Sequence, residues 1–155
     1  MIASRLVLAV AMLLLAAGCD GGSTPAPSDP QYGADTCVRC RSTIKDPRFA
    51  AQYRLADGTV KLFDDPGCLV LSLKDETGTA AAIFVHDHDG ERWLPAADAS
   101  FAHTSRTETP RGYGWAAHAS FGAAQDAVTK AGSGEILGWD QLRDRITRTP
   151  DAAGK

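Results

Sequence analysis

Methionine is nearly absent from this 155-residue chain, and its two copies, Met1 and Met12, both lie close to the N-terminus. The sequence has no apolar run of about 20 residues, the length that a membrane-spanning helix requires. It has no phosphate-binding loop, nucleophile elbow, paired-carboxylate signature or His-Glu-x-x-His motif. The formal net charge is −3 and no basic cluster is present, which argues against a nucleic-acid partner. Because the catalytic motifs named above are absent, we predict that the protein is not an enzyme.

The N-terminus has the features of an export signal. Arg5 precedes an apolar run over residues 6–17, and small residues lead directly to Cys19. A run of about 12 residues suits the apolar part of a signal peptide and is too short to cross a bilayer. We predict a lipoprotein signal peptide over residues 1–18 with lipid attachment at Cys19. The alternative is a weak membrane anchor that ends at a free cysteine.

The composition divides the rest of the chain into three parts. Residues 20–30 are rich in Gly, Pro and Ser and contain no large apolar side chain, so we predict a flexible tether over residues 19–34. Residues 35–148 are long enough to form one domain with its own core. Residues 149–155 are predicted to be a disordered tail.

Two halves of the domain show the same order of predicted elements. In the first half, strands at 49–55 and 59–63 meet at an Asp57-Gly58 turn, a helix capped by Asp65 begins at Pro66, and a strand covers 80–85. In the second half, strands are expected at 99–103, 114–120 and 135–138, with a helix at 123–130. A last short helix is expected to be capped by Asp140. The predicted fold class is α+β, with two ββαβ units packed into one small domain.

Three thiols, Cys37, Cys40 and Cys68, remain once Cys19 is assigned to lipidation. Thiolates are preferred by soft and borderline metals, and a Cys-x-x-Cys loop can direct two sulfurs at one ion. A metal site is therefore the leading hypothesis, with extra thiolate character expected for Cys68 near a helix start. The alternatives are a Cys37–Cys40 disulfide in an oxidising compartment and a buried core position for Cys68.

Two histidines are candidate additional ligands. His86 and His88 lie two residues apart at a predicted strand end, so both rings would leave the same face and could share a metal. The alternative is that both lie on the surface in a solvated turn, because Asp87, Asp89 and Gly90 surround them. His118 alternates with its apolar neighbours and is expected to face a groove.

Several short motifs together resemble the NosL family. They are Cys37-Val-Arg-Cys40, Arg48-Phe-Ala-Ala-Gln52, Asp57-Gly58, Phe63-Asp-Asp-Pro-Gly-Cys68, the strand at Trp93, Thr109-Pro110 and Gly134-Glu-Ile-Leu-Gly-Trp139. The resemblance implies a periplasmic lipoprotein, anchored at the inner membrane, that binds Cu(I) and helps to assemble the copper centres of nitrous oxide reductase. It also implies two ββαβ units and a client cuproenzyme or another copper-handling protein as partner.

The chain departs from the family pattern where methionine is expected. The family usually has Gly-Met after the second cysteine and Thr-Pro-Met further on, whereas this chain has Arg41-Ser42 and Thr109-Pro110-Arg111. No thioether ligand can therefore be carried over from the family. A metal site here would consist of thiolates and imidazoles.

Three classes of function follow from these residues. The first is a membrane-anchored Cu(I)-binding protein, since two or three thiolates satisfy Cu(I). The second is a thiol oxidoreductase that uses the Cys-x-x-Cys loop, although the residues after Cys40 show no amphipathic helix. The third is a structural zinc site in which a histidine completes a tetrahedron with the three cysteines.

Overall fold

The computed structural model describes residues 25–148. The predicted signal peptide over residues 1–18, the lipidation site Cys19 and the tail over residues 149–155 lie outside the described residues. Within residues 25–148, no helix has the length and apolar character that crossing a membrane requires.

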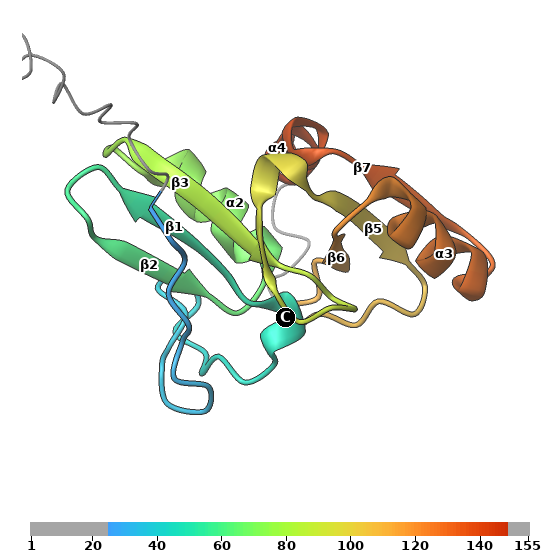
Figure 1. Cartoon of the computed structure of the whole chain (residues 1–155), viewed down its shortest axis with the longest axis horizontal. Coiled ribbons are helices and arrows are strands. Elements are labelled where there is room, and N and C mark those ends of the chain that lie inside the picture. The colour runs from blue at the N-terminus through green and yellow to red at the C-terminus, as the bar shows by residue number, and fades with distance from the viewer. Residues whose placement is uncertain (1–24, 149–155) are drawn as a thin grey trace, which may run out of the picture.

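The described chain forms two antiparallel sheets (Figure 1). The first has the strand order β2-β1-β3-β4 and the second has the order β6-β5-β7. The strands are β1 (Ala51–Leu55), β2 (Val60–Phe63), β3 (Ala80–His86), β4 (Trp93–Pro95), β5 (Ser100–Thr104), β6 (Trp115–His118) and β7 (Gly134–Leu137). The helices are α2 (Pro66–Asp75), α3 (Phe121–Ala131) and α4 (Trp139–Arg148), with short 3-10 turns η1 (Pro47–Phe49) and η2 (Ala96–Asp98). The predicted α+β fold with two ββαβ units is confirmed, and β4 extends the first sheet.

Local sequence signals determine where two of the helices begin. The Asp65 carboxylate accepts a hydrogen bond from Gly67 N at 2.8 Å, and Pro66 occupies the first helical position of α2. The Ser120 hydroxyl accepts a bond from Ala123 N at 3.1 Å and caps α3. The predicted start of α2 at Pro66 is confirmed, and α3 begins at Phe121, two residues before the predicted residue 123.

The predicted cap of the last helix is wrong. Asp140 lies inside the first turn of α4, which begins at Trp139. The Trp139 side chain is buried, with its ring centre 5.9 Å from that of Phe101, so the helix begins two residues earlier than predicted and includes this core residue. The Gln141 side chain accepts a hydrogen bond from Gly138 N at 3.0 Å and supplies a polar contact at this helix start.

Helix α2 joins the two halves of the molecule. It packs on β1 and β2 of the first sheet and also contacts β6 and α4 of the second half, and Figure 1 shows it behind the first sheet. Its first six residues are all buried. Helix α3 covers the second sheet. Both halves of the molecule therefore pack against α2, and the buried start of this helix lies in the core.

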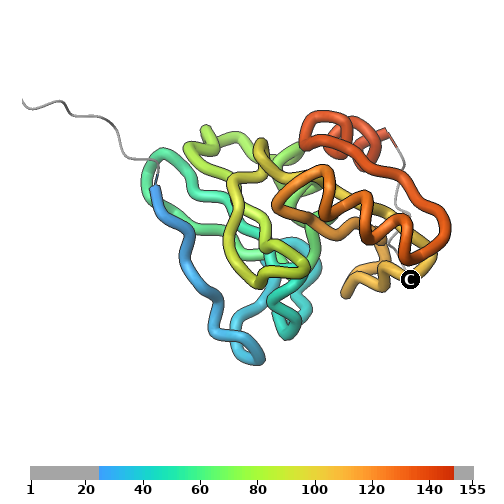
Figure 2. Tube along the Cα trace, turned by 45° about the vertical axis from the view of Figure 1, so that its right-hand side comes forward, coloured from blue at the N-terminus to red at the C-terminus, as the bar shows by residue number. Residues whose placement is uncertain are grey.

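The tether predicted over residues 19–34 is wrong for its second half. Ser28 N donates to Gln52 Oε1 at 2.9 Å, and Gln52 Nε2 donates to Ser28 O at 2.8 Å. Trp93 Nε1 donates to Asp29 at 2.7 Å, and Pro30 is buried. Figure 2 shows this segment, in blue, running alongside the first sheet. These polar contacts hold the segment on the domain although it lacks large apolar side chains.

Glu76, which follows the last turn of α2, provides a test of stability against pH. Its carboxylate accepts hydrogen bonds from Lys61 Nζ at 2.6 Å, Tyr53 Oη at 2.6 Å and Gly78 N at 2.9 Å. These donors, Lys61 first, lower the pKa of Glu76 from 4.5 to about 2. A lowered carboxyl pKa stabilises the folded protein above pH 4.5, and this contribution is lost as the pH falls through about 2.

We therefore expect Glu76→Gln to unfold at a lower temperature than the wild type at pH 7. The difference should shrink steadily between pH 4.5 and pH 2, where the wild-type carboxylate also becomes protonated. Thermal unfolding followed by circular dichroism at several pH values measures it. A difference that stays constant over this range would contradict the assignment.

Candidate metal centre

The Cys-x-x-Cys loop is the tip of a small hairpin. Thr36 and Thr43 form a β-bridge at its base, and Cys37 N donates to Ser42 O at 2.8 Å. Val38 N donates to Leu62 O at 3.0 Å, so the loop is fixed to the edge of β2. Arg41 turns the chain with a φ of 65°, a left-handed conformation that favours glycine.

Two further side chains reach this loop from the junction between β2 and α2. Asp64 follows β2 directly, and Cys68 is the third residue of α2. Cys40 Sγ donates to Asp64 Oδ1 at 3.2 Å, and the Asp64 side chain is buried. Cys37 and Cys68 are also buried, whereas Cys40 is partly exposed and is the thiol most open to solvent.

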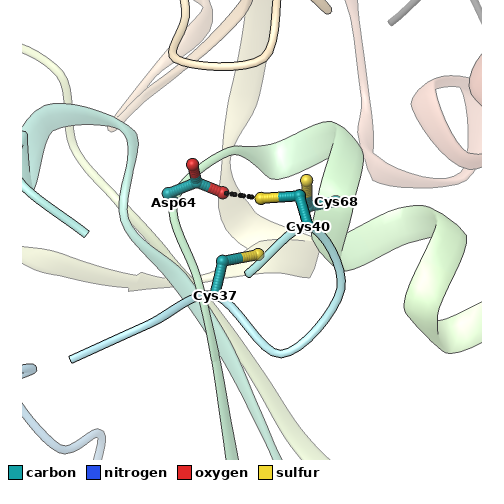
Figure 3. A group of neighbouring side chains, drawn as sticks. All are labelled: Cys37, Cys40, Asp64 and Cys68. Atoms are coloured by element: carbon teal, nitrogen blue, oxygen red, sulfur yellow. Dashed lines mark hydrogen bonds between the residues drawn. The ribbon is translucent and has the colours of Figure 1, made fainter. Parts of the chain in front are cut away.

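The four side chains converge on one point (Figure 3). One ligand atom from each of Cys37, Cys40, Asp64 and Cys68 lies within 4.8 Å of all the others. Two sulfurs that bind the same ion at about 2.3 Å can be no more than about 4.6 Å apart. The observed spacing therefore needs only small side-chain adjustments to place three sulfurs around one metal, so the donor set fits a thiophilic ion.

The three thiols do not ionise equally. The Cys68 thiol donates toward the Cys37 sulfur, and backbone amides of Cys40 and Asp64 point at the same atom, which lowers the pKa of Cys37 to about 7. The pKa of Cys68 is raised, first by this hydrogen bond and then by burial. Burial also raises the pKa of Cys40. This geometry favours ionisation of Cys37 before Cys68, because Cys68 acts as its donor, in contrast to the thiolate character expected for Cys68.

This geometry bears on the two alternatives for the cysteines, which were a Cys37–Cys40 disulfide and a buried core position for Cys68. All three cysteines within residues 25–148 are free thiols, so the structure describes the reduced state rather than a Cys37–Cys40 disulfide. Cys68 belongs to the apolar core, and its sulfur also lies within 4.8 Å of the other ligand atoms of the group. Both interpretations of Cys68 are therefore compatible with its position.

The candidate histidines lie outside this group. The His86 ring packs edge-on against Trp93, 4.9 Å between ring centres, and its side chain is buried, so its assignment to a solvated turn is wrong. His88 is partly exposed and lies against Phe49 and His118. The structure brings neither His86 nor His88 into the group of three thiols and Asp64. His118, expected to face a groove, lines a cavity together with His88.

Asp64 was missed by sequence reasoning. Of the two aspartates in the Phe63-Asp-Asp-Pro-Gly-Cys68 motif, only Asp65 was given a role, that of helix cap, and the structure confirms this role. The available signal was the position of Asp64, directly after a strand and four residues before a candidate ligand. Sequence spacing could not show that the Cys-x-x-Cys loop approaches this strand end.

Asp65 positions the start of α2, which carries Cys68. In addition to Gly67 N, its carboxylate accepts hydrogen bonds from Thr109 Oγ1 at 2.6 Å and Arg111 N at 3.0 Å. Burial raises the pKa of Asp65 to about 6 despite these donors, so the carboxylate is ionised at neutral pH. The loop after β5, which contains the Thr-Pro motif, is thus held against the start of α2.

No family model matches the sequence, and no curated protein matches it. The fold is similar to the crystal structure of the copper chaperone NosL from Shewanella denitrificans, with a TM-score of 0.64. The two chains share 18% sequence identity, and the similarity covers 76% of this chain and 96% of that chain. The resemblance to the NosL family is therefore confirmed at the level of the fold.

Proposed function

We propose that this protein is a Cu(I)-binding lipoprotein of the periplasm that carries or stores copper and catalyses no reaction. The observation that carries the proposal is the convergence on one point of Cys37 and Cys40, from the Cys-x-x-Cys loop, and Cys68, from α2. Cu(I) is satisfied by two or three soft ligands, so these thiols suffice without methionine. The similarity of the fold to a copper chaperone supports the same interpretation.

A structural zinc site is the second candidate, and Asp64 is the observation that favours it. Zinc binds four ligands in a tetrahedron, and a carboxylate oxygen could occupy the fourth position beside three thiolates. Cu(I) does not need this oxygen, because a hard carboxylate adds little to a soft ion. Zinc would therefore need all four side chains, whereas Cu(I) would need only the thiols.

A competition for metal tests this proposal. The reduced protein should take up one Cu(I) per chain from a chromogenic chelator and should retain it in the presence of excess Zn(II). Oxidation of Cys37 and Cys40 to a disulfide should prevent uptake, because only thiolates bind the ion. Displacement of Cu(I) by stoichiometric Zn(II) would instead assign the protein to the zinc class.

The proposed location and partner follow from the N-terminal sequence and the family resemblance. Lipidation at Cys19 would hold the domain on the periplasmic face of the inner membrane. The partner would be a client cuproenzyme, such as nitrous oxide reductase, or another copper-handling protein. The intact mass of the membrane-extracted protein tests the anchor, since an unmodified and soluble protein would contradict it.

A further inference from the structure

A second group of potential ligands lies where the two sheets meet. His88 belongs to the turn after β3, and its backbone N donates to Ala117 O at 2.8 Å, which ties this turn to β6. His118 is the last residue of β6. The ring centres of His88 and His118 are therefore only 5.6 Å apart, although 30 positions separate them in the sequence.

One carboxylate orients both rings. Asp89 Oδ1 lies 3.0 Å from His88 Nδ1, and Asp89 Oδ2 lies 3.1 Å from His118 Nδ1. These contacts, that of His88 first, lower the pKa of Asp89, so the group is an ionised acceptor at neutral pH. Each Nδ1 must then carry the proton, and each Nε2 of a neutral ring has a free lone pair. This arrangement is typical of metal-binding histidines, whose second nitrogen donates to a carboxylate.

His118 has an unsatisfied nitrogen. Its side chain is only 1% exposed, and its Nε2 has no hydrogen-bond partner within the described part of the chain. Burial lowers the pKa of His118, which keeps the ring neutral. A buried acceptor without a donor destabilises the folded protein. His118, His88 and Asp89 all line the same cavity of about 460 Å³, so a ligand in this cavity could satisfy the nitrogen.

We propose that His88 and His118 form a second metal site, in which their Nε2 atoms bind one divalent borderline ion and Asp89 positions the rings. An ion about 2.1 Å from each Nε2 lies about 3.2 Å from each ring centre, so two rings that share it are at most about 6.4 Å apart. The observed 5.6 Å satisfies this limit. Glu108 lines the same cavity and offers a further oxygen ligand.

The chemistry of this site differs from that of the thiol group. Imidazole nitrogens suit Cu(II) and Zn(II), and Cu(II) binds more tightly than Zn(II) to most nitrogen sites. The thiols instead suit Cu(I). The proposed site shares no residue with Cys37, Cys40, Asp64 and Cys68, so it stands whether or not the thiol site carries copper.

The test uses Cu(II) with the purified protein in which Cys37, Cys40 and Cys68 are replaced by serine, with folding verified by circular dichroism. Electron paramagnetic resonance should show one saturable Cu(II) with couplings to two imidazole nitrogens. His88→Gln and His118→Gln should each remove one nitrogen coupling and weaken binding at least about tenfold, and Asp89→Asn should weaken it about 10-fold to 100-fold. His103→Gln, which alters an exposed ring on β5, is the matched control and should change nothing.

Cu(II) spectra that are the same in the His88→Gln and His118→Gln variants as in their parent would overturn the proposal. So would the absence of any saturable Cu(II). His88 is partly exposed, so His88→Gln keeps the test decisive even if His118→Gln fails to fold. Because the parent protein lacks the thiols, none of these results depends on Cu(I) binding at the cysteines.

Discussion

Cys37→Ser should lower the affinity of this protein for Cu(I) by about two orders of magnitude or more. Structural sites with four ligands bind zinc with about 10–16 kcal/mol, so one ligand contributes about 3 kcal/mol, which corresponds to more than 100-fold in the dissociation constant. Cys37 is the thiol with the lowest pKa, and serine at this position would be a protonated, hard ligand. Chelator competition under reducing conditions measures the effect.

Asp64→Asn is the matched control for this variant. Asparagine keeps the shape of the side chain and an oxygen that can accept from Cys40 Sγ, but it removes the negative charge. Cu(I) affinity should remain within about threefold of the wild type, whereas Zn(II) affinity should fall about 100-fold, because only zinc needs a fourth ligand. Full Cu(I) affinity in a double variant, Cys37→Ser with Cys40→Ser, would refute the thiol site.

Local signals in the sequence predicted most of the elements. The Asp57-Gly58 turn, the Asp65-Pro66 helix start and the alternation of apolar residues are short-range features whose physical causes act within a few residues. The strand and helix bounds accordingly agree with the structure to within a few residues. The cap of α4 was misplaced because burial of Trp139, a long-range effect, decided where that helix begins.

The candidate sites depended on contacts that a single sequence does not specify. The three thiols could be grouped by their chemistry, but the position of Asp64 beside them results from the pairing of the hairpin loop with β2. His88 was paired with His86 because they are close in sequence. Its neighbour in space is His118, since the turn after β3 is bonded to β6. The segment at Ser28 seemed a free tether because the Gln52 side chain that holds it is 24 residues away.

The departures from the family pattern also have a structural meaning. Arg41 stands where the family usually has glycine, and the backbone retains the left-handed turn that glycine would adopt easily. This loop therefore contains a left-handed residue without a glycine at that position. Arg111 N donates a hydrogen bond to the Asp65 carboxylate, so the loop after β5 contacts the start of α2 whatever the side chain at position 111.

Asp65→Ala should destabilise the fold by about 2–3 kcal/mol, because it leaves Gly67 N, Thr109 Oγ1 and Arg111 N without their acceptor in a buried position. For a domain of this size, the melting temperature should fall by about 10 °C. The start of α2 would also lose its connection to the loop after β5, so Cys68 would be held less firmly. Cu(I) affinity should therefore fall as well, although no ligand is removed.

Ser120→Ala is the control for the loss of Cu(I) affinity expected in Asp65→Ala. Ser120→Ala removes the equivalent cap from α3, but the Ser120 hydroxyl accepts a single hydrogen bond among the described residues, from Ala123 N, at an exposed position. Ser120→Ala should lower the free energy of unfolding by about 1 kcal/mol. It should leave Cu(I) affinity unchanged, because α3 supplies no residue to the group of three thiols and Asp64. Thermal unfolding and chelator competition on both variants separate general destabilisation from loss of positioning. Equal losses of Cu(I) affinity in the two variants would show that Asp65 does not hold the start of α2 in place.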